Sequence, residues 1–480
     1  MRRSAGDTHC VEPAAPLRPA LSPSRIRRLR LWSAAMVDLQ PFHGIRYAPD
    51  APAIRESPLE ALIAPPYDVI SDRDLDGYYA RDPHNIVRID LNRPEPGDAE
   101  LARYTRANDF FTRWLEAGVL RRDAEAALYV LTQRFTGPDG VERVRTGFFS
   151  RARLQPFDAG VILPHERTLR GPKVDRLNLY RATRASLSPI FGAYADPQGA
   201  VRGALEAALG QSAPVATARF LGVENRLYAL TDAAAVAAIV GPLADAKLYI
   251  ADGHHRYETA LAYRDEQRAA HGRGPSDAGP EFVLMFASAV EDPGMVIFPT
   301  HRLVTNLASL PAGAALDAEL EAKLAPFFER TPLGDASPRE AQAALGARRS
   351  SFVLKTASAA TLLTLRVDAP LDAVLGLPRE PALRLLDVSV LHAIVLEHLL
   401  GISAEAQATQ ANLRYSKDFG EAFAAPSSGV GGEAVQLALL MNPTRMDEVV
   451  AVAESGAVMP QKSTFFYPKI PTGLVLYPFA

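Results

Sequence analysis

The sequence predicts a mixed α/β (α+β) protein, because helical and strand-like segments alternate along most of the chain. Two strand-like runs, Ala127–Phe135 and Val141–Phe149, flank the turn signal Gly137-Pro-Asp-Gly140, which predicts a β-hairpin. An amphipathic pattern over Glu100–Gly118 predicts a helix that ends at its glycine. The segment Leu248–Ala262 (LYIADGHHRYETALA) predicts a strand, a tight turn and a helix in succession.

The last third of the chain continues this alternation. A second hairpin is expected from Ser351–Thr356 and Thr361–Arg366, and strands are expected at Phe282–Ala289 and Ala434–Met441. An amphipathic helix is predicted from Asp387, as its N-cap, to Leu400, with Gly401 following its end.

A chain of 480 residues is long enough for more than one domain. We predict four parts: a disordered extension or misplaced start at 1–36, an N-terminal α/β segment at 37–150, a catalytic core at 151–310 and a C-terminal α/β domain at 311–480. Residues 1–36 hold seven arginines, but only Asp7 and Glu12 as acids. A start codon placed too early would make Met36 the true first residue, and an arginine-rich targeting peptide is the alternative.

Composition excludes several classes of protein. The 52 Lys+Arg against 55 Asp+Glu give a net charge of -3, so a general affinity for nucleic acid is not indicated. Cys10 is the single cysteine, which excludes an intramolecular disulfide and a multi-cysteine zinc site. No run of 18 apolar residues exists, so we expect no transmembrane helix and a soluble, cytoplasmic protein. The oligomeric state cannot be read from these features.

The strongest candidate site is the segment Asp252-Gly253-His254-His255-Arg256, where a predicted strand turns into a helix. Glycine permits a sharp turn, and the N–H groups at a helix N-terminus attract anions. Arginine can donate two hydrogen bonds to phosphate oxygens, and the histidines can donate hydrogen bonds or transfer protons. The alternative is a capped turn with surface histidines.

A second candidate lies at His165-Glu166, followed by Lys173, Asp175 and Arg176. Glu166 could act as general base for a hydroxyl while Lys173 and Arg176 bind phosphate, or the segment could be a structural cluster of ion pairs. His165 is a possible substrate ligand.

Two weaker candidates follow later in the chain. One is Lys462-Ser463-Thr464 with Lys469, and the other is His301-Arg302. A zinc site at His254 and Glu258 is a minor alternative, because the HExxH motif is absent. The chain also lacks the P-loop, the G-x-G-x-x-G fingerprint and the protein-kinase signatures. Any phosphate chemistry must therefore use a different phosphate-binding element.

Four motifs together resemble the domain-of-unknown-function 1015 family: ADGHHRYETA, LPHERT…PKVDRLNLYRATRASLSPIFG, FPTHRLV and MPQKSTFFYPK. The likeness runs from about Val37 to Tyr477. The DGHHR turn is also similar to free-serine kinases of the ParB/sulfiredoxin-like superfamily, in which a strand-turn-helix element holds phosphates. The resemblance implies a ParB/sulfiredoxin-like phosphate-binding core with additional α/β segments.

The resemblance further implies transfer of a phosphoryl group from pyrophosphate or a nucleotide to free L-serine, giving O-phosphoserine. Gly253, His254, His255 and Arg256 would hold donor phosphates, with Lys173, Arg176 and Lys462 offsetting charge. Glu166 would take the hydroxyl proton, and Asp252 would bind serine or the expected Mg²⁺. His165, His301, Arg302 and Lys469 would be further substrate ligands.

Two other functions remain open from the sequence. A phosphoserine phosphatase would use the same anion site with water in place of serine. A ParB-like, nucleotide-responsive DNA-binding protein would need a basic groove and a helix-turn-helix, and the charge balance opposes it.

Overall fold

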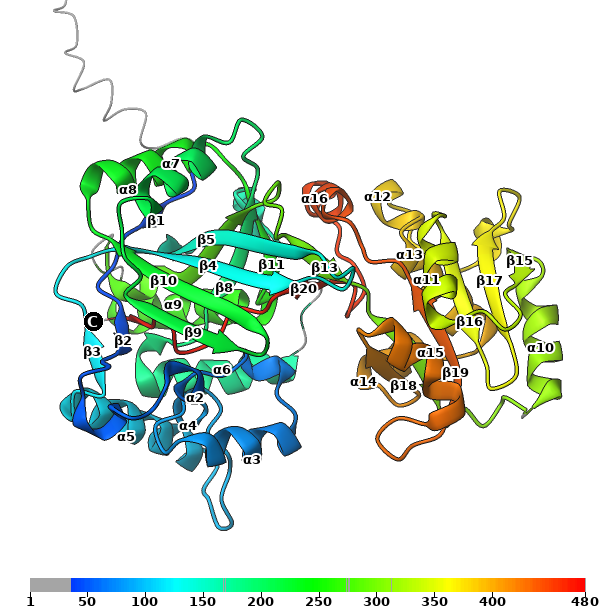
Figure 1. Cartoon of the computed structure of the whole chain (residues 1–480), viewed down its shortest axis with the longest axis horizontal. Coiled ribbons are helices and arrows are strands. Elements are labelled where there is room, and N and C mark those ends of the chain that lie inside the picture. Colours follow the sequence, from blue (N-terminus) through cyan, green and yellow to red (C-terminus); the bar gives the residue numbers. More distant parts are fainter. Residues whose placement is uncertain are drawn as a thin grey trace, which may run out of the picture. The chain divides into compact units, whose positions relative to one another are not determined.

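A computed structural model describes residues 36–166, 168, 170–272, 274, 277–311 and 313–479. The predictions for residues 1–35, Cys10 included, lie outside this part of the chain. Residues 37–480 form one compact unit with a mixed α/β architecture (Figure 1). Among the described residues, no helix is both long and apolar enough to cross a bilayer.

The larger of the two main sheets has nine strands in the order β6-β11-β8-β12-β5-β4-β10-β9, with β1 paired to β5. Most neighbours are antiparallel, but β11 runs parallel to β6 and β12 runs parallel to β8. The strands are β1 Leu39–Gln40, β4 Leu128–Thr136, β5 Glu142–Arg153, β6 Ile162–Leu163, β8 Ile190–Tyr194, β9 Ala216–Phe220, β10 Val223–Leu230, β11 Leu248–Asp252 and β12 Phe282–Ala289.

The predicted first hairpin is confirmed as β4 and β5, which pair from Tyr129–Phe149 to Thr136–Glu142. The predicted strand at Phe282–Ala289 is confirmed as β12, and all of its residues are buried. β5 continues to Arg153, so the expected domain boundary near residue 150 falls inside a strand. Strands from 37–150 and from 151–310 therefore share one sheet.

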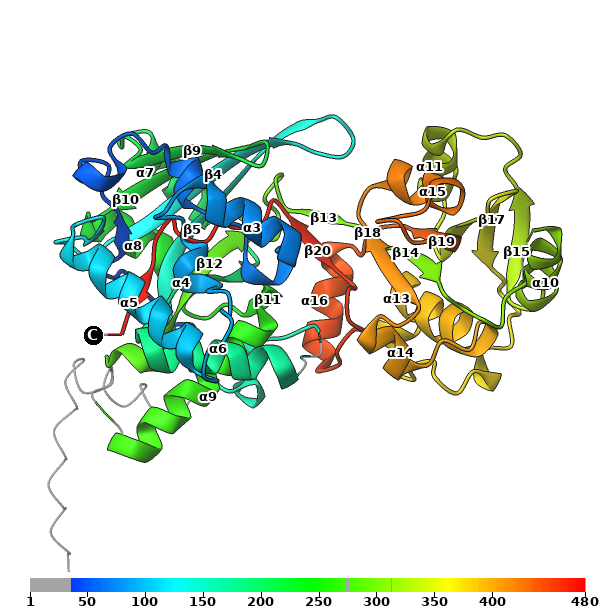
Figure 2. The same cartoon turned by 90° about the horizontal axis from the view of Figure 1, so that it is seen from below.

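Helices lie in the segments that connect the strands of this sheet. They are α2 Leu59–Leu62, α3 Asp72–Arg81, α4 Val87–Asp90, α5 Ala102–Glu116, α6 Arg170–Thr183, α7 Ala200–Leu209, α8 Ala233–Val240 and α9 His254–His271. The amphipathic pattern at Glu100–Gly118 is confirmed as α5, which buries Tyr104, Phe111 and Trp114. Figure 2 shows α6 and α9 side by side, where Tyr180 and Tyr263 stack with ring centroids 5.6 Å apart.

The second main sheet has six strands in the order β15-β17-β16-β19-β14-β18. They are β14 His301–Thr305, β15 Phe328–Pro332, β16 Ser351–Lys355, β17 Ala360–Leu365, β18 Leu413–Ser416 and β19 Val435–Met441. The predicted second hairpin is confirmed as β16 and β17, and the strand predicted near Ala434 as β19. The accompanying helices are α10 Ala314–Leu324, α11 Pro338–Gly346, α12 Pro381–Arg384, α13 Asp387–Val390, α14 Ala404–Thr409, α15 Phe419–Ser428 and α16 Met446–Ser455.

The helix predicted from Asp387 to Leu400 differs from the prediction in its start and its type. Leu386 holds the N-cap position, and the helix widens to a π-helix over Leu391–Leu399. Asp387 does not cap because its carboxyl accepts hydrogen bonds from the Ser350 backbone and the Asn442 side chain. Burial raises the pKa of this carboxyl to about 6.

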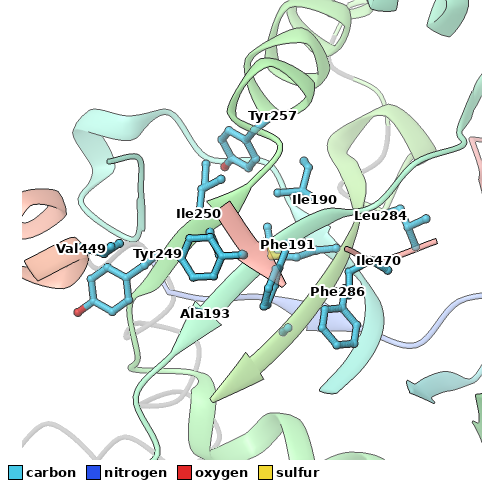
Figure 3. Packing of buried hydrophobic residues seen from close by; sticks show 14 of the residues in the cluster. Ile190, Phe191, Ala193, Tyr249, Ile250, Tyr257, Leu284, Phe286, Val449 and Ile470 are labelled. Atoms are coloured by element: carbon cyan, nitrogen blue, oxygen red, sulfur yellow. The ribbon is translucent and has the colours of Figure 1, made fainter. Parts of the chain in front are cut away.

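The C-terminal tail returns to the large sheet. β20 Phe465–Tyr467 pairs with β13 Val296–Phe298, and β21 Tyr477–Pro478 pairs with β7 Ala185–Ser186. A further small sheet joins β2 Ile45–Tyr47 and β3 Leu120–Arg122. In Figure 3, Ile470 of the tail lies by Phe286, in the core that surrounds Phe191. The tail thereby brings Lys469 to Asp252 at the end of β11.

Candidate functional site

The predicted strand-turn-helix is confirmed as β11, Gly253 and α9. Gly253 holds φ 92° and ψ 29° at the N-cap of α9. A Cβ at this position would come within 3.0 Å of Arg256 Nε, in a backbone conformation that side chains disfavour. The turn therefore requires glycine twice over, for its backbone angle and for the close approach of the guanidinium.

Asp252 ends β11 between two cations. Its Oδ2 lies 2.9 Å from Arg256 Nη2, and its Oδ1 lies 3.0 Å from Lys469 Nζ. Burial by itself raises the pKa of Asp252, but Lys469 and Arg256 outweigh burial and hold the pKa below its usual range. Arg256 is buried and also donates through Nη1 to the Pro189 carbonyl. Both terminal nitrogens of this arginine thus have partners inside the protein.

Two neutral histidines lie against the turn. His165 donates from Nδ1 to the Ile250 carbonyl over 2.7 Å, so its Nε2 accepts from the Thr464 hydroxyl over 3.0 Å. The His165 backbone N–H donates to His254 Nε2 over 3.3 Å, and the two ring centroids lie 4.6 Å apart. Burial lowers the pKa of His165 to about 4 and that of His254 well below its ordinary value.

His255, the next residue of α9, is half-buried, and burial lowers its pKa as well. The histidines of the turn therefore supply neutral hydrogen-bonding groups at pH 7 rather than cations.

Glu166 follows His165 and is held by the tail. Its Oε1 accepts from the Lys462 backbone N–H over 3.1 Å, and the Met459 N–H donates to the His165 carbonyl over 2.7 Å. Burial raises the pKa of Glu166 to about 7, against the opposing effects of the Lys462 N–H and charge. The residue is half-buried rather than fully enclosed. Glu166 can exchange a proton near neutral pH.

The structure thus brings predicted residues together at the turn, namely His165, Glu166, Asp252, Gly253, His254, Arg256, Lys462 and Lys469. Lys173 and Arg176 instead belong to ion pairs of their own. Lys173 Nζ lies 2.6 Å from Glu258 Oε2, while Arg176 is buried, 3.2 Å from Asp90 Oδ1, and its guanidinium lies 4.0 Å from the centroid of the Tyr67 ring.

Arg302 and His301 lie on β14, where their side chains have different partners. Arg302 is fully buried and donates from Nη2 to the Lys462 carbonyl over 3.0 Å and to His392 Nε2 over 2.8 Å. Within the described residues, no carboxylate lies within ion-pair distance of Arg302, and burial lowers its pKa to about 10. Arg302 therefore fixes the carbonyl of the residue whose N–H holds Glu166.

The described residues do not fit the Mg²⁺ site expected at Asp252. They include no cluster of three His, Cys, Asp or Glu side chains suited to a metal ion. Both Asp252 oxygens face cations, which a metal ion would have to displace. The described residues do not provide a zinc ligand set at His254 and Glu258 either, because Glu258 forms an ion pair with Lys173.

Sequence reasoning missed Lys417 and the aromatic residue Phe298, which line a cavity that also contains Lys469 and His301. Lys417 directly follows the strand β18, and a cation at a strand end was the available signal. Arg145, fully buried at an inward position of β5, was missed as well.

A family model described as "Protein of unknown function (DUF1015)" matches residues 39–389. The chain belongs to this family. A comparison of this DUF1015 sequence with curated proteins found no match.

Solved structures show distant likeness. A conserved hypothetical protein from Pyrococcus furiosus is 13% identical, with 68% of this chain and 93% of that chain covered and a TM-score of 0.31. A glutamate-to-alanine mutant of a free serine kinase in complex with AMP is 9% identical, covering 67% and 86%, with a TM-score of 0.32. C-terminally truncated SbnI from Staphylococcus aureus is 10% identical, covering 68% and 87%, with a TM-score of 0.30.

Proposed function

We propose that this protein is a phosphotransferase that converts free L-serine to O-phosphoserine, with pyrophosphate or a nucleotide as phosphoryl donor. The observation that carries the proposal is Glu166, whose carboxyl has a pKa of about 7 beside the turn at Asp252 and Gly253. A general base works best when its pKa lies near the working pH. Glu166 therefore suits removal of a proton from an alcohol.

In the proposed reaction, the serine hydroxyl oxygen attacks the terminal phosphorus of the donor while its proton passes to Glu166. The bond between this phosphorus and the bridging oxygen breaks, and that oxygen leaves with its electron pair on the remaining phosphate. The Lys462 N–H orients the Glu166 carboxylate, because it donates to Oε1.

The donor phosphates would meet the N-terminus of α9 and the ammonium of Lys469. A helix N-terminus presents N–H groups and a positive dipole end to anions. Lys469 already lies 3.0 Å from Asp252 Oδ1, so its ammonium is held at the turn before a ligand arrives. The described residues offer no cage for Mg²⁺, so these side chains alone would hold the donor.

The proposal is tested by incubating the protein with serine, Mg²⁺ and pyrophosphate, ADP or ATP, and measuring O-phosphoserine. Glu166→Gln should lower the rate by a factor of about 100 or more. Glu206→Gln on exposed α7 is the matched control and should retain the rate.

Absence of phosphoserine with every donor refutes the proposal. Phosphate release from O-phosphoserine without an acceptor would identify a phosphatase instead.

A further inference from the structure

A cavity of about 980 Å³ opens beside the β13–β20 ribbon, and three aromatic side chains form part of its wall. Phe298 stacks on Tyr467 with centroids 4.5 Å apart and lies 6.3 Å from Phe465, at interplanar angles of 15°. We call Phe298, Phe465 and Tyr467 the aromatic ladder. All three side chains are partly exposed, so a ligand can contact them.

Two ammonium groups approach the same ring of the ladder. Lys469 Nζ lies 4.4 Å and Lys417 Nζ 4.9 Å from the centroid of Phe465. Lys469 has Asp252 as its carboxylate partner. In the portion of the chain that the structure describes, no carboxylate lies within ion-pair distance of Lys417. Burial and the nearby Lys469 lower the pKa of Lys417, while Glu421 acts in the opposite direction.

His301 adds a hydrogen-bond donor without a partner to the lining of this cavity. The side chain is fully buried, and its Nδ1 accepts from the Met441 N–H over 3.2 Å. The neutral ring therefore carries its proton on Nε2. Nε2 has no hydrogen-bond partner among the described residues. Buried donors are normally satisfied, so an acceptor is expected here.

The carboxylates of the lining have local partners. Asp418 caps α15 by accepting from the Glu421 N–H, and Asp74 accepts from the Ser71 hydroxyl. Neither carboxylate pairs with Lys417. At the Phe465 ring itself the ammonium groups of Lys417 and Lys469 lie together, and Lys417 has no ion-pair partner among the described residues, which favours a ligand with anionic oxygens there.

We propose that this cavity binds a diphosphate-bearing ligand, with its anionic oxygens between Lys417 and Lys469 and the aromatic ladder alongside. The inference rests on the proposed function, because Lys469 also contacts Asp252 and the ligand is then the phosphoryl donor. Inorganic pyrophosphate and a nucleoside diphosphate share this chemistry. A planar base would in addition stack on the ladder.

The test is isothermal titration calorimetry of the full chain with pyrophosphate, ADP and adenosine, without serine. Pyrophosphate and ADP should bind, and Lys417→Gln should weaken both by about tenfold or more, the effect of one charge-assisted hydrogen bond. Lys417→Arg, which keeps the charge, should retain binding and shows that the site is still folded. Lys323→Gln on α10 is the matched control and should change nothing, because Lys323 does not line the cavity.

Two outcomes overturn the inference: neither phosphate ligand binds, or Lys417→Gln leaves both affinities unchanged. Adenosine binding as tightly as ADP overturns it too, because the phosphates would then contribute nothing. Tighter binding of ADP than of pyrophosphate, abolished by Phe298→Leu, supports the nucleotide as the ligand. Binding without any phosphoserine formation would refute the proposed function alone, because calorimetry without serine involves no turnover.

Discussion

Replacing Glu166 by glutamine should make the protein more stable at pH 8 and much less active. The pKa of this carboxyl is about 7 in the folded protein, against an ordinary value of 4.5. That difference corresponds to about 3 kcal/mol of unfavourable free energy for holding the charged form in the fold. Glutamine keeps an oxygen for the Lys462 N–H but carries no charge.

The sign of the effect follows from proton linkage. Below about pH 4.5 the carboxyl is protonated in both the folded and the unfolded chain, so the raised pKa has no effect on stability. Between 4.5 and 7 the folded protein binds more protons than the unfolded chain, so its stability falls as the pH rises. Above pH 7 the folded protein has lost the full stability that corresponds to the raised pKa of Glu166. Glu166→Gln should remove this loss.

Thermal unfolding at pH 5 and pH 8 measures this effect. The variant should gain up to about 3 kcal/mol over the wild-type protein at pH 8, and much less at pH 5. Glu206→Gln, an exposed glutamate on α7, should show no such pH-dependent gain. A Glu166→Gln variant that is less stable than wild type at pH 8, or equally shifted at both pH values, would refute the reasoning. In that case burial does not raise the pKa of Glu166.

Three further changes test the site. Gly253→Ala should destabilise the protein by about 1–3 kcal/mol because of its positive φ and the nearby guanidinium, whereas Gly203→Ala on α7, where the new Cβ meets open space, should not; equal melting temperatures would contradict this. Asp252→Asn should cost about 3–5 kcal/mol in denaturant unfolding, because buried Arg256 loses its carboxylate; an unchanged midpoint would show the pair to be dispensable. Arg302→Met should shift the acid limb of the pH–rate profile to higher pH than in the wild-type protein, because the loss of a nearby cation raises the pKa of Glu166. An acid limb at the wild-type pH would exclude this role of Arg302.

Local features of the fold could be read from the sequence because their causes are local. The turn at Gly253 and both hairpins depend on residues within a few positions of one another. The helix at Asp387 fails this rule, since its would-be cap is drawn to Ser350 and Asn442 from other parts of the chain.

The composition of the site depended on long-range structure instead. Lys469 reaches Asp252 from 217 positions away only because the tail pairs as β20 with β13. Sequence reasoning proposed Arg176 as a phosphate ligand, but Asp90, which lies 86 positions earlier, pairs with it in the folded chain. No local pattern distinguishes a cation that is paired in this way from one that awaits a ligand.

The arrangement of charge suggests how donor and base influence each other. Asp252 raises the pKa of Glu166, whereas Lys462 and Lys469 lower it. An anionic donor that binds at Lys469 would partly neutralise this lysine and raise the pKa of Glu166 further, so the base would be less ionised when it is needed. A second cation that compensates the donor would limit this loss. Lys417, with no carboxylate partner in the described chain and on the same Phe465 ring as Lys469, stands where that compensation is required.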